Sequence, residues 1–178
     1  MFKKMTVKDF CLISIFTALI AVMAQISIPM PLGVDMTMQT FAISLAAVIL
    51  GANRSAVCAV IYLLIGAFGM PVFSQFSGGI GVIFGRTGGF LLSFPLMAWV
   101  IGFGAEKNNN FSLIAGFLGG TIINFLTGML VFSLVSESSW AIAFAACVVP
   151  FIPTTIIKSI SSAIIGLRIK RVLKKSNF

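Results

Sequence analysis

Residues 111–135 read FSLIAGFLGGTIINFLTGMLVFSLV, a stretch without a single charged side chain. About 20 consecutive apolar residues suffice to cross the hydrocarbon core of a bilayer as an α-helix, and this stretch is longer. Because lipid offers no hydrogen-bond partners, a crossing segment must pair its own backbone N–H and C=O groups, which a helix does. Residues 111–135 therefore predict a membrane-spanning helix.

The rest of the chain has the same apolar character. Of its 178 residues, 59% are hydrophobic and 9% are charged, with a mean hydropathy of +1.13. Soluble domains carry about 25% charged residues. A chain this short has too much surface to hide so many apolar side chains from water. The surplus must face lipid, and we expect residues 1–178 to form one all-α integral membrane domain.

Apolar runs separated by turn residues predict a bundle of six membrane-spanning helices. Pro29 and Pro31 close the first span, and the second is short for a full crossing. Residues 140–149 are too few to span and read as a surface or re-entrant helix. The expected spans are residues 9–28, 38–50, 55–68, 88–104, 111–135, and a last one from near residue 153 into the basic tail.

The charged residues support this count. Lysine and arginine are enriched in the cytoplasmic loops of membrane proteins. Here they recur at alternate turns, whereas the opposite turns hold Asp35 and Glu137 and no lysine. The alternation predicts that both termini are cytoplasmic. The residues assigned to that side are Lys3, Lys4, Lys8, Arg54, Lys107, Arg168, Lys170, Arg171, Lys174 and Lys175.

Composition also argues against several function classes. The net charge of +8 is carried by chain ends and turns, which reads as a membrane-orientation signal rather than as a nucleic-acid surface. The chain has no histidine, the commonest general base and transition-metal ligand. Cys11, Cys58 and Cys147 lie in apolar runs without metal-ligand spacing. We expect neither nucleic-acid binding nor a metal site.

Two basic residues depart from the alternation. Arg86 falls on the outer side in a glycine-rich segment, and Lys158 lies inside the last span. An ionisable group at membrane depth is costly, which makes it a functional-site candidate. If both cations converge, with the Thr155 hydroxyl nearby, they form a site for a carboxylate. The alternatives are a salt bridge to Asp35 or Glu137, snorkelling of Lys158, and contact of Arg86 with lipid headgroups.

The glycine-rich segment, residues 78–90, lacks the Gly-Lys-Ser/Thr ending of a phosphate-binding loop. It reads either as a loop that folds over a pocket or as an ordinary connection. Phe73 and Phe84 are candidate pocket walls. Gln39 and Asn124 are polar groups at membrane depth that can contact a ligand or join helices. We favour the interhelical role for Asn124, and both roles stay open for Gln39.

The first span carries small residues on one face. Thr17 and Ala21 form a small-xxx-small pair, and Ala24 lies close by. Small side chains let a second helix approach closely. The spacing fits a neighbouring span of the same chain as well as a second protein.

Six short segments together resemble one known family. They are AQISIP at 24–29, MQTF at 38–41, YLLIGAFGMPVF at 62–73, GGIGV at 78–82, TGGF at 87–90 followed by Phe94-Pro95, and PFIP at 150–153 followed by Lys158. In this order they are similar to the biotin-specific substrate-binding component of energy-coupling factor transporters, the BioY family. The resemblance runs through nearly the whole chain.

The resemblance implies six membrane helices in the cell membrane and high-affinity capture of biotin from outside. It also implies partners: a transmembrane coupling protein, contacted through Thr17 and Ala21, and two ATP-binding proteins. Biotin would be a ligand, with no cofactor. Arg86 and Lys158 would hold its carboxylate, under loops that close over it. Possible polar contacts to its ring system are Gln39, Gln75 and Asn124.

The sequence departs from the family pattern before its lysine. Thr154 and Thr155 stand where the family commonly has Gly-Asp, and Arg86 stands where many relatives have proline. A related carboxylate, such as lipoate or a biotin precursor, therefore stays an alternative ligand.

Two other classes compete with a transporter subunit. A standalone secondary carrier would use acids within the membrane, whereas the four acids here lie at span ends or turns. An intramembrane enzyme would need Ser161 or Ser162 activated by Lys158. We expect a transport subunit and not an enzyme. Because the chain has no ATP-binding motif, energy must come from partners or an ion gradient.

Overall fold

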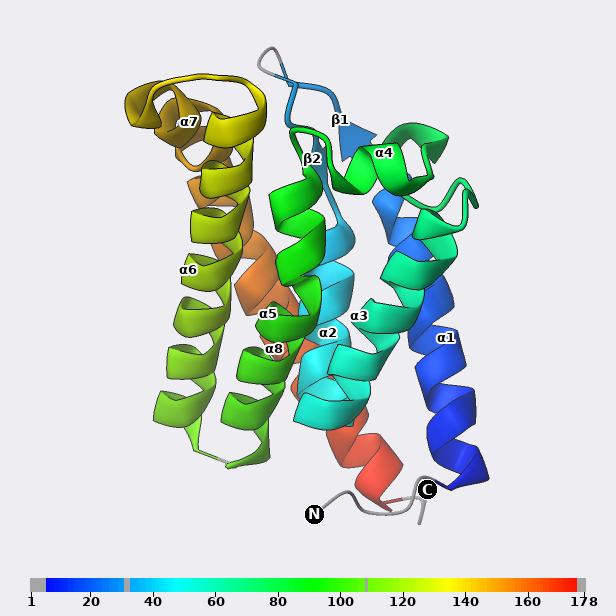
Figure 1. Ribbon diagram of the computed structural model, residues 1–178. Coiled ribbons are helices and arrows are strands. Elements are labelled where there is room, and N and C mark those ends of the chain that lie inside the picture. Colours follow the sequence, from blue (N-terminus) through cyan, green and yellow to red (C-terminus); the bar gives the residue numbers. More distant parts are fainter. Residues whose placement is uncertain (1–5, 31–32, 108, 176–178) are drawn as a thin grey trace.

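The computed structural model describes residues 6–30, 33–107 and 109–175, with side chains up to residue 173. It is almost entirely helical, which confirms the predicted class. Figure 1 shows the long helices running side by side, with the start of α1 and the end of α8 at the same end of the bundle. The elements are α1 Val7–Ala24, β1 Ser27–Ile28, β2 Met36–Thr37, α2 Gln39–Leu50, α3 Ala52–Ala67, η1 Ser74–Phe76, α4 Ile80–Ile83, α5 Gly88–Glu106, α6 Asn110–Val135, α7 Trp140–Cys147, η2 Val149–Phe151 and α8 Ile152–Lys175.

Four helical segments of the described chain are long and apolar enough to cross a membrane. They are α1, α5, α6 and the continuous stretch Trp140–Leu173, which joins α7 to α8. The apolar helices α2 and α3 are shorter. The predicted 140–149 segment is thus α7, which packs against α6 before the chain turns into α8. Pro150 lies in η2 at this bend, and Pro153 lies in the first turn of α8, where its missing N–H costs no intrahelical hydrogen bond.

The first span ends earlier than its apolar composition predicts. Helix α1 stops at Ala24, and Ser27–Ile28 instead form an antiparallel pair with Met36–Thr37. The backbone N–H of Met38 also donates to the carbonyl of Ile26. The prediction that the helix continues to residue 28 is wrong, because these backbone groups find strand partners in the same outer connection. This two-stranded ribbon holds the chain across the outer end of the bundle.

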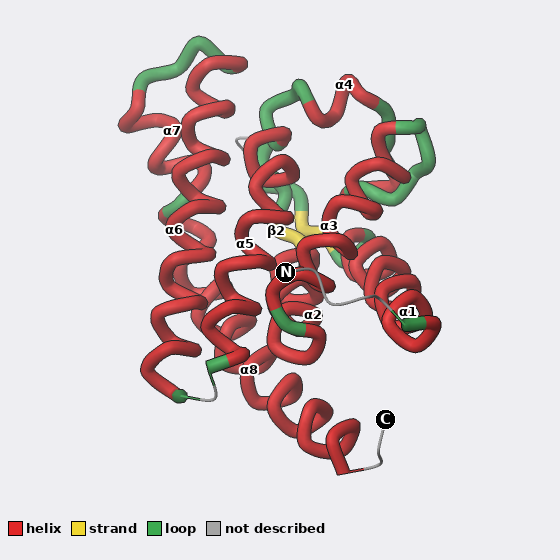
Figure 2. The backbone as a smooth tube through the Cα atoms, turned by 60° about the horizontal axis from the view of Figure 1, so that its bottom comes forward, coloured by secondary structure: helices red, strands yellow, loops and turns green. Residues whose placement is uncertain are grey.

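Helix α2 forms the centre of the bundle. Gln39 and all residues from Phe41 to Leu50 are buried. It contacts α1, α3, α5 and α8, and Figure 2 shows it enclosed among them. A helix surrounded by protein need not present a full membrane-length apolar surface to lipid, which explains how a 12-residue helix fits a membrane protein.

Helices α5 and α6 form the most extensive helix pair. Gly104 and Gly116 allow this close approach, because a Cβ atom at either position would meet backbone of the facing helix. A Cβ at Gly116 would lie 3.1 Å from the Val100 carbonyl oxygen and 3.2 Å from the Cα of Gly104. Small residues at a membrane helix contact let the backbones come together in this way.

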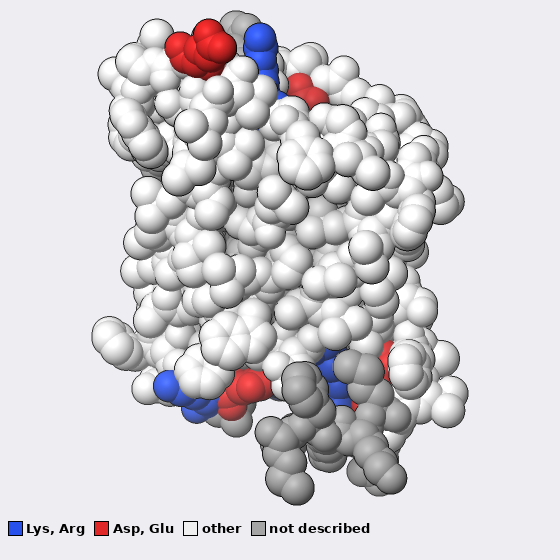
Figure 3. Space-filling model, in the orientation of Figure 1, with Lys and Arg blue, Asp and Glu red and all other residues white. Residues whose placement is uncertain are grey.

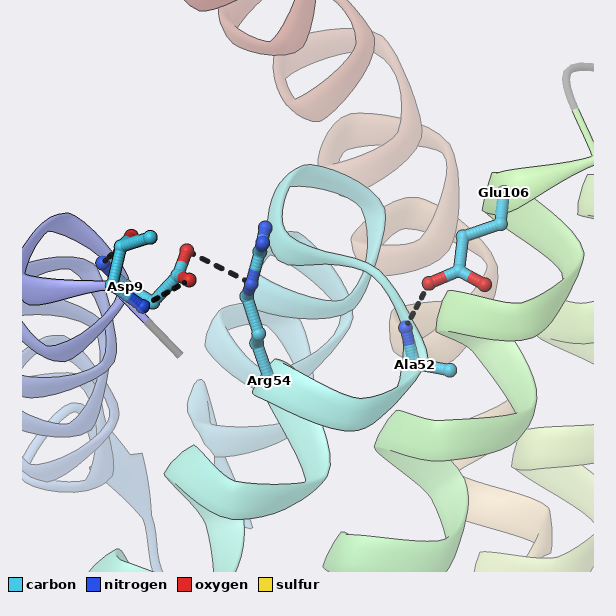
Figure 4. A network of polar contacts seen from close by, with 5 residues as sticks. Asp9, Ala52, Arg54 and Glu106 are labelled. Carbon is cyan, nitrogen blue, oxygen red and sulfur yellow. Dashed lines mark hydrogen bonds and ion pairs between the residues drawn. The ribbon is translucent and has the colours of Figure 1, made fainter. Parts of the chain in front are cut away.

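Charged side chains gather at the two ends of the bundle. Figure 3 shows them at both ends of the visible face, with an uncharged band between. At the end where α1 begins, Arg54 pairs with Asp9 at 3.0 Å, and Glu106 accepts a hydrogen bond from the first N–H of α3, at Ala52 (Figure 4). These contacts tie α1 and α5 to the start of α3. The Glu106 carboxylate gives the first N–H of α3 a hydrogen-bond partner that it would otherwise lack.

We expect Gly116→Leu to lower the free energy of unfolding by about 1–3 kcal/mol, the usual cost of forcing extra atoms into a packed contact. Thermal unfolding in detergent measures this. The matched control is Ala115→Leu on the neighbouring, exposed position, which should leave the melting temperature unchanged. Equal melting temperatures for the two variants would contradict the close α5–α6 contact.

Candidate ligand-binding site

A cavity of about 60 Å³ lies beneath the outer connections. Its walls come from the loop before α2, the start of α2, the segment between α3 and α5, and the helices α5, α6 and α8. The lining residues are Val34, Asp35, Thr37, Gln39, Thr40, Phe73, Ser74, Val82, Thr87, Phe90, Leu91, Phe94, Met97, Thr121, Asn124, Phe125, Phe151, Thr155 and Lys158. Of the eight residues predicted to bind ligand, five line this cavity: Lys158, Gln39, Asn124, Thr155 and Phe73.

Lys158 projects from α8 into the cavity wall and is bonded to the start of α2. Its Nζ donates to the carbonyl oxygen of Thr37 at 2.7 Å and lies 3.4 Å from the Thr40 hydroxyl. Among the described residues no acid pairs with it, so the predicted alternative of a salt bridge to Asp35 or Glu137 is not what the structure shows. An ammonium has three N–H donors. Two have these partners, and among the described residues the third has none, which leaves it available to a ligand.

Gln39 is oriented by a series of hydrogen bonds that runs from Thr37 to Val72. Its side-chain oxygen accepts from the Thr37 hydroxyl at 2.8 Å, and its side-chain N–H donates to the Tyr62 hydroxyl. Tyr62 in turn donates to the carbonyl of Val72 at 2.9 Å. The chain joins α2 and α3 to the segment that follows α3. Gln39 therefore both lines the cavity and joins elements, which combines the two roles left open by the sequence.

Tyr62 also positions an aromatic wall of the cavity. Its ring meets that of Phe73 edge to face, with centroids 5.5 Å apart, and Gly66 leaves the space into which the Phe73 ring fits. Phe73 is 1% exposed and lines the cavity as predicted. Sequence reasoning missed Tyr62, although a hydroxyl inside an apolar run was a usable signal. It missed Thr37 because the contact to Lys158 uses the backbone carbonyl, which every residue type has.

Asn124 joins two helices, as favoured from the sequence. From α6 its side-chain amide donates to the Phe90 carbonyl at 3.2 Å and to the Ser93 hydroxyl at 2.7 Å, both on α5. Asn124 is buried and also borders the cavity. Since both of its donors are used on α5, its side-chain oxygen is the group left to meet a ligand.

The outer loops are tied to each other above the cavity. Gln25, at the end of α1, donates to the Phe73 carbonyl at 3.1 Å and accepts from the N–H of Phe76 at 2.9 Å. Gln75, with a positive φ of 54°, donates to Asp35 at 2.8 Å. These bonds connect the segment after α1 with the segment after α3. Gln25 escaped sequence reasoning because its partners lie about 50 residues away.

Three predicted site residues lie outside the cavity wall. Gln75 bonds to Asp35 on the surface, and Phe84 is 72% exposed. Arg86 is exposed, and one of its Nη atoms lies 3.6 Å from the position that a Cβ on Gly33 would occupy. The structure thus places Arg86 against the outer loop and does not bring it together with Lys158. Its role as a carboxylate partner stays a prediction.

The small residues of α1 pack inside the molecule. Thr17 is buried, and its hydroxyl lies 3.4 Å from the Cys58 carbonyl on α3. Ala24 is fully buried, whereas Ala21 is partly exposed. Of the two alternatives drawn from the sequence, the neighbouring span accounts for Thr17 and Ala24. Thr17 and Ala24 are buried within this chain, and contact of this face of α1 with a partner protein stays a prediction.

The fold and the cavity define a helical protein of the membrane class with a small, partly polar cavity beneath its outer loops. The family model for the BioY family matches residues 1–175. "Biotin transporter BioY" of Thermotoga maritima is 41% identical over 160 residues, covering 89% of this chain and 93% of the relative. "Biotin transporter BioY2" of Lactococcus lactis is 34% identical over 168 residues, covering 93% and 92%. The chain belongs to the BioY family.

One solved structure has the same fold. It is the crystal structure of the S-component for biotin from an ECF-type ABC transporter, with a TM-score of 0.85 and 24% sequence identity. The match covers 94% of this chain and 95% of that one. The two chains therefore share the same fold.

We expect Tyr62→Phe to lower the free energy of unfolding by about 1–3 kcal/mol, because it leaves the Val72 carbonyl and the Gln39 amide without their buried partner. Thermal unfolding of the ligand-free protein in detergent measures this. Ser14→Ala is the control, since that hydroxyl bonds only within its own helix on an exposed face. A Tyr62→Phe protein as stable as the control would show that the hydrogen-bond chain is unimportant.

Proposed function

We propose that this chain is the biotin-binding subunit of an energy-coupling factor transporter, which captures biotin from outside and passes it inward with ATP-driven partners. The observation that carries the proposal is a cation, Lys158, at the wall of a cavity beneath the outer loops of a BioY-family fold. Relatives across 89–93% of the chain are named biotin transporters, which supports biotin as the ligand.

The Lys158 ammonium is the group proposed to hold the ligand's carboxylate. It is fixed by Thr37 and Thr40 and keeps one donor for an anion. Phe73, Phe90 and Phe94 supply apolar surface for a hydrocarbon ligand body, and Gln39 and Asn124 supply polar edges. Arg86, at the outer surface beside Gly33, would join only after the loop moves inward.

Binding requires the outer loops to move. Pockets for small ligands enclose about 300–1,000 Å³, whereas this cavity measures about 60 Å³. The segments that cover it are tied by the Gln25 and Gln75 side chains rather than by packed helices. We therefore propose that these loops open for entry and close around the ligand.

The proposed topology is a single domain of six crossings, α1, α2, α3, α5, α6 and α8, with both termini cytoplasmic in the cell membrane. Lys8, Arg54 and Lys107 share the end of the bundle where α1 begins, which supports that orientation under the positive-inside rule. The proposed partners are a transmembrane coupling protein and two ATP-binding proteins. Exposed residues of α1 beside Ala21 are the proposed contact.

The competing functions receive less support. Asp9 and Glu106 serve helix-end contacts, and Asp35 bonds to Gln75, so these acids have structural partners that ion coupling would have to displace. The Ser162 hydroxyl donates to the Ser159 carbonyl, and Lys158 is bonded to α2. Among the described residues no hydrogen bond joins Lys158 to Ser161 or Ser162. A related carboxylate such as lipoate stays the alternative ligand, given Thr154 and Thr155 before the lysine.

We expect Lys158→Met to weaken biotin binding by about 1.5–3 kcal/mol, since it removes a charged hydrogen-bond partner. Equilibrium binding to the purified protein measures this for biotin and for biotin methyl ester. The wild type should prefer biotin to its methyl ester, because only the free acid has an anion to pair with Lys158. The variant should lose this preference, because it lacks the cation. Lys107→Met, at the far end of the bundle, is the control.

Arg86→Met in the same assay decides whether the outer arginine reaches the carboxylate. A loss for biotin and not for its ester would place Arg86 at the anion in the bound state. If Lys158→Met keeps full discrimination between acid and ester, the proposed carboxylate site is wrong. Binding of lipoate in competition with biotin tests the alternative ligand.

Transport is tested in vesicles that contain this chain with or without the coupling protein and the ATP-binding proteins. We expect biotin to accumulate only when the partners and ATP are present, because the chain has no ATP-binding motif. Accumulation driven by an ion gradient without partners would show a standalone carrier instead.

A further inference from the structure

Two buried hydroxyls lie just outside the ligand cavity, and each contacts a side-chain amide that lines it. Tyr62 on α3 accepts a hydrogen bond from Gln39 on α2. Ser93 on α5 accepts one from Asn124 on α6. Both hydroxyl-bearing residues are buried, and neither belongs to the cavity wall, whereas both amides do. The two hydroxyls can therefore affect a ligand only through the amides that they orient.

The Tyr62 hydroxyl fixes which way round the Gln39 amide lies. A hydroxyl has one proton, and Tyr62 donates it to the Val72 carbonyl at 2.9 Å, which can only accept. Toward Gln39 the Tyr62 oxygen can therefore only accept, so the amide nitrogen must face it. The amide oxygen in turn accepts from the Thr37 hydroxyl, whose own oxygen accepts from the Gln39 backbone N–H. Both ends of the amide thus have one consistent orientation.

Ser93 fixes Asn124 in the same manner. Its hydroxyl donates to the Phe90 carbonyl at 2.8 Å, so toward the Asn124 amide it can only accept. The Asn124 amide nitrogen also donates to the Phe90 carbonyl. Asn124 is left with its side-chain oxygen, an acceptor, to present to the cavity.

Gln39 contributes the opposite kind of group. One of its two side-chain N–H groups goes to Tyr62, and in the part of the chain that the structure describes no protein group accepts from the second. A buried N–H without a partner costs free energy, which a ligand acceptor recovers. The cavity wall therefore offers an oriented donor from α2 and an oriented acceptor from α6.

This pair of groups is complementary to a cyclic urea, the polar end of biotin. A cyclic urea has N–H donors on either side of one C=O acceptor, so an N–H can pair with Asn124 while the C=O pairs with Gln39. We propose that Tyr62 is a positioning residue for ligand specificity, which keeps a Gln39 N–H directed at the ureido oxygen by donating its own proton to Val72. The proposal rests on the proposed function, in which biotin is the ligand of this cavity.

Iminobiotin tests the proposal, because a C=N–H group replaces the ureido C=O and the rest of the molecule is unchanged. The ring is then a guanidine, which is protonated near neutral pH and donates where the urea accepts. We expect the wild type to bind biotin more tightly than iminobiotin. Tyr62→Phe frees the Gln39 amide to turn its oxygen toward the ligand. We expect this variant to lower the ratio of the iminobiotin to the biotin dissociation constant about tenfold, the size of one hydrogen bond.

Two further variants separate positioning from a general loss of structure. Gln39→Glu places an acceptor at the same position, and it should lower the ratio in the same direction. Ile43→Val lies one turn further along α2, at a fully buried residue outside the cavity wall. It should keep the wild-type ratio, whatever it does to stability. Equilibrium binding of both ligands to the purified proteins measures the ratios.

An unchanged ratio in Tyr62→Phe would overturn the proposal, including the case in which both ligands weaken equally, because a merely structural role has that effect. If Tyr62→Phe does not fold, an unchanged ratio in Gln39→Glu overturns it instead. In both cases the wild type still binds biotin, so the proposed function stands. A wild type without affinity for biotin would contradict the proposed function itself.

Discussion

A charged ammonium at membrane depth is stable only with hydrogen-bond partners, and the outer half of this molecule is arranged around the partners of Lys158. The ammonium bonds to the Thr37 carbonyl and lies within reach of the Thr40 hydroxyl. Thr37 belongs to the strand pair that carries the first connection across the bundle. One half-buried charge therefore fixes α8 to the start of α2 and holds the outer ribbon over the cavity.

The helices could be predicted from the sequence because the constraint that forms them is local. Backbone groups in hydrocarbon must pair within their own segment, so an apolar run such as residues 111–135 specifies its own helix, and α6 runs Asn110–Val135. Asn124 on that helix was also assigned its interhelical role correctly, since a lone amide at depth needs a polar partner nearby.

The outer loops could not be predicted in the same way, because their structure depends on distant partners. Gln25 bonds to residues 48 and 51 positions away, and no local pattern signals such contacts. The same holds for Arg86. Its charge made it a candidate, but whether it meets Lys158 depends on how the residues 78–87 fold back, and there the chain turns the arginine toward Gly33. Helix ends next to such loops, such as the early end of α1, are hard to predict from the sequence for the same reason.

The geometry at Lys158 suggests why a lysine suits this position. A guanidinium is a flat fork that favours one bidentate partner, whereas an ammonium directs three donors to separate acceptors. With one donor on Thr37 and another toward Thr40, a ligand carboxylate can take the third without breaking the bond to the loop. Lys158 would then join its own helix, α8, to the start of α2 and to the ligand at once. Ligand binding would strengthen the hold on the outer ribbon instead of competing with it, and this links occupancy of the cavity to closure above it.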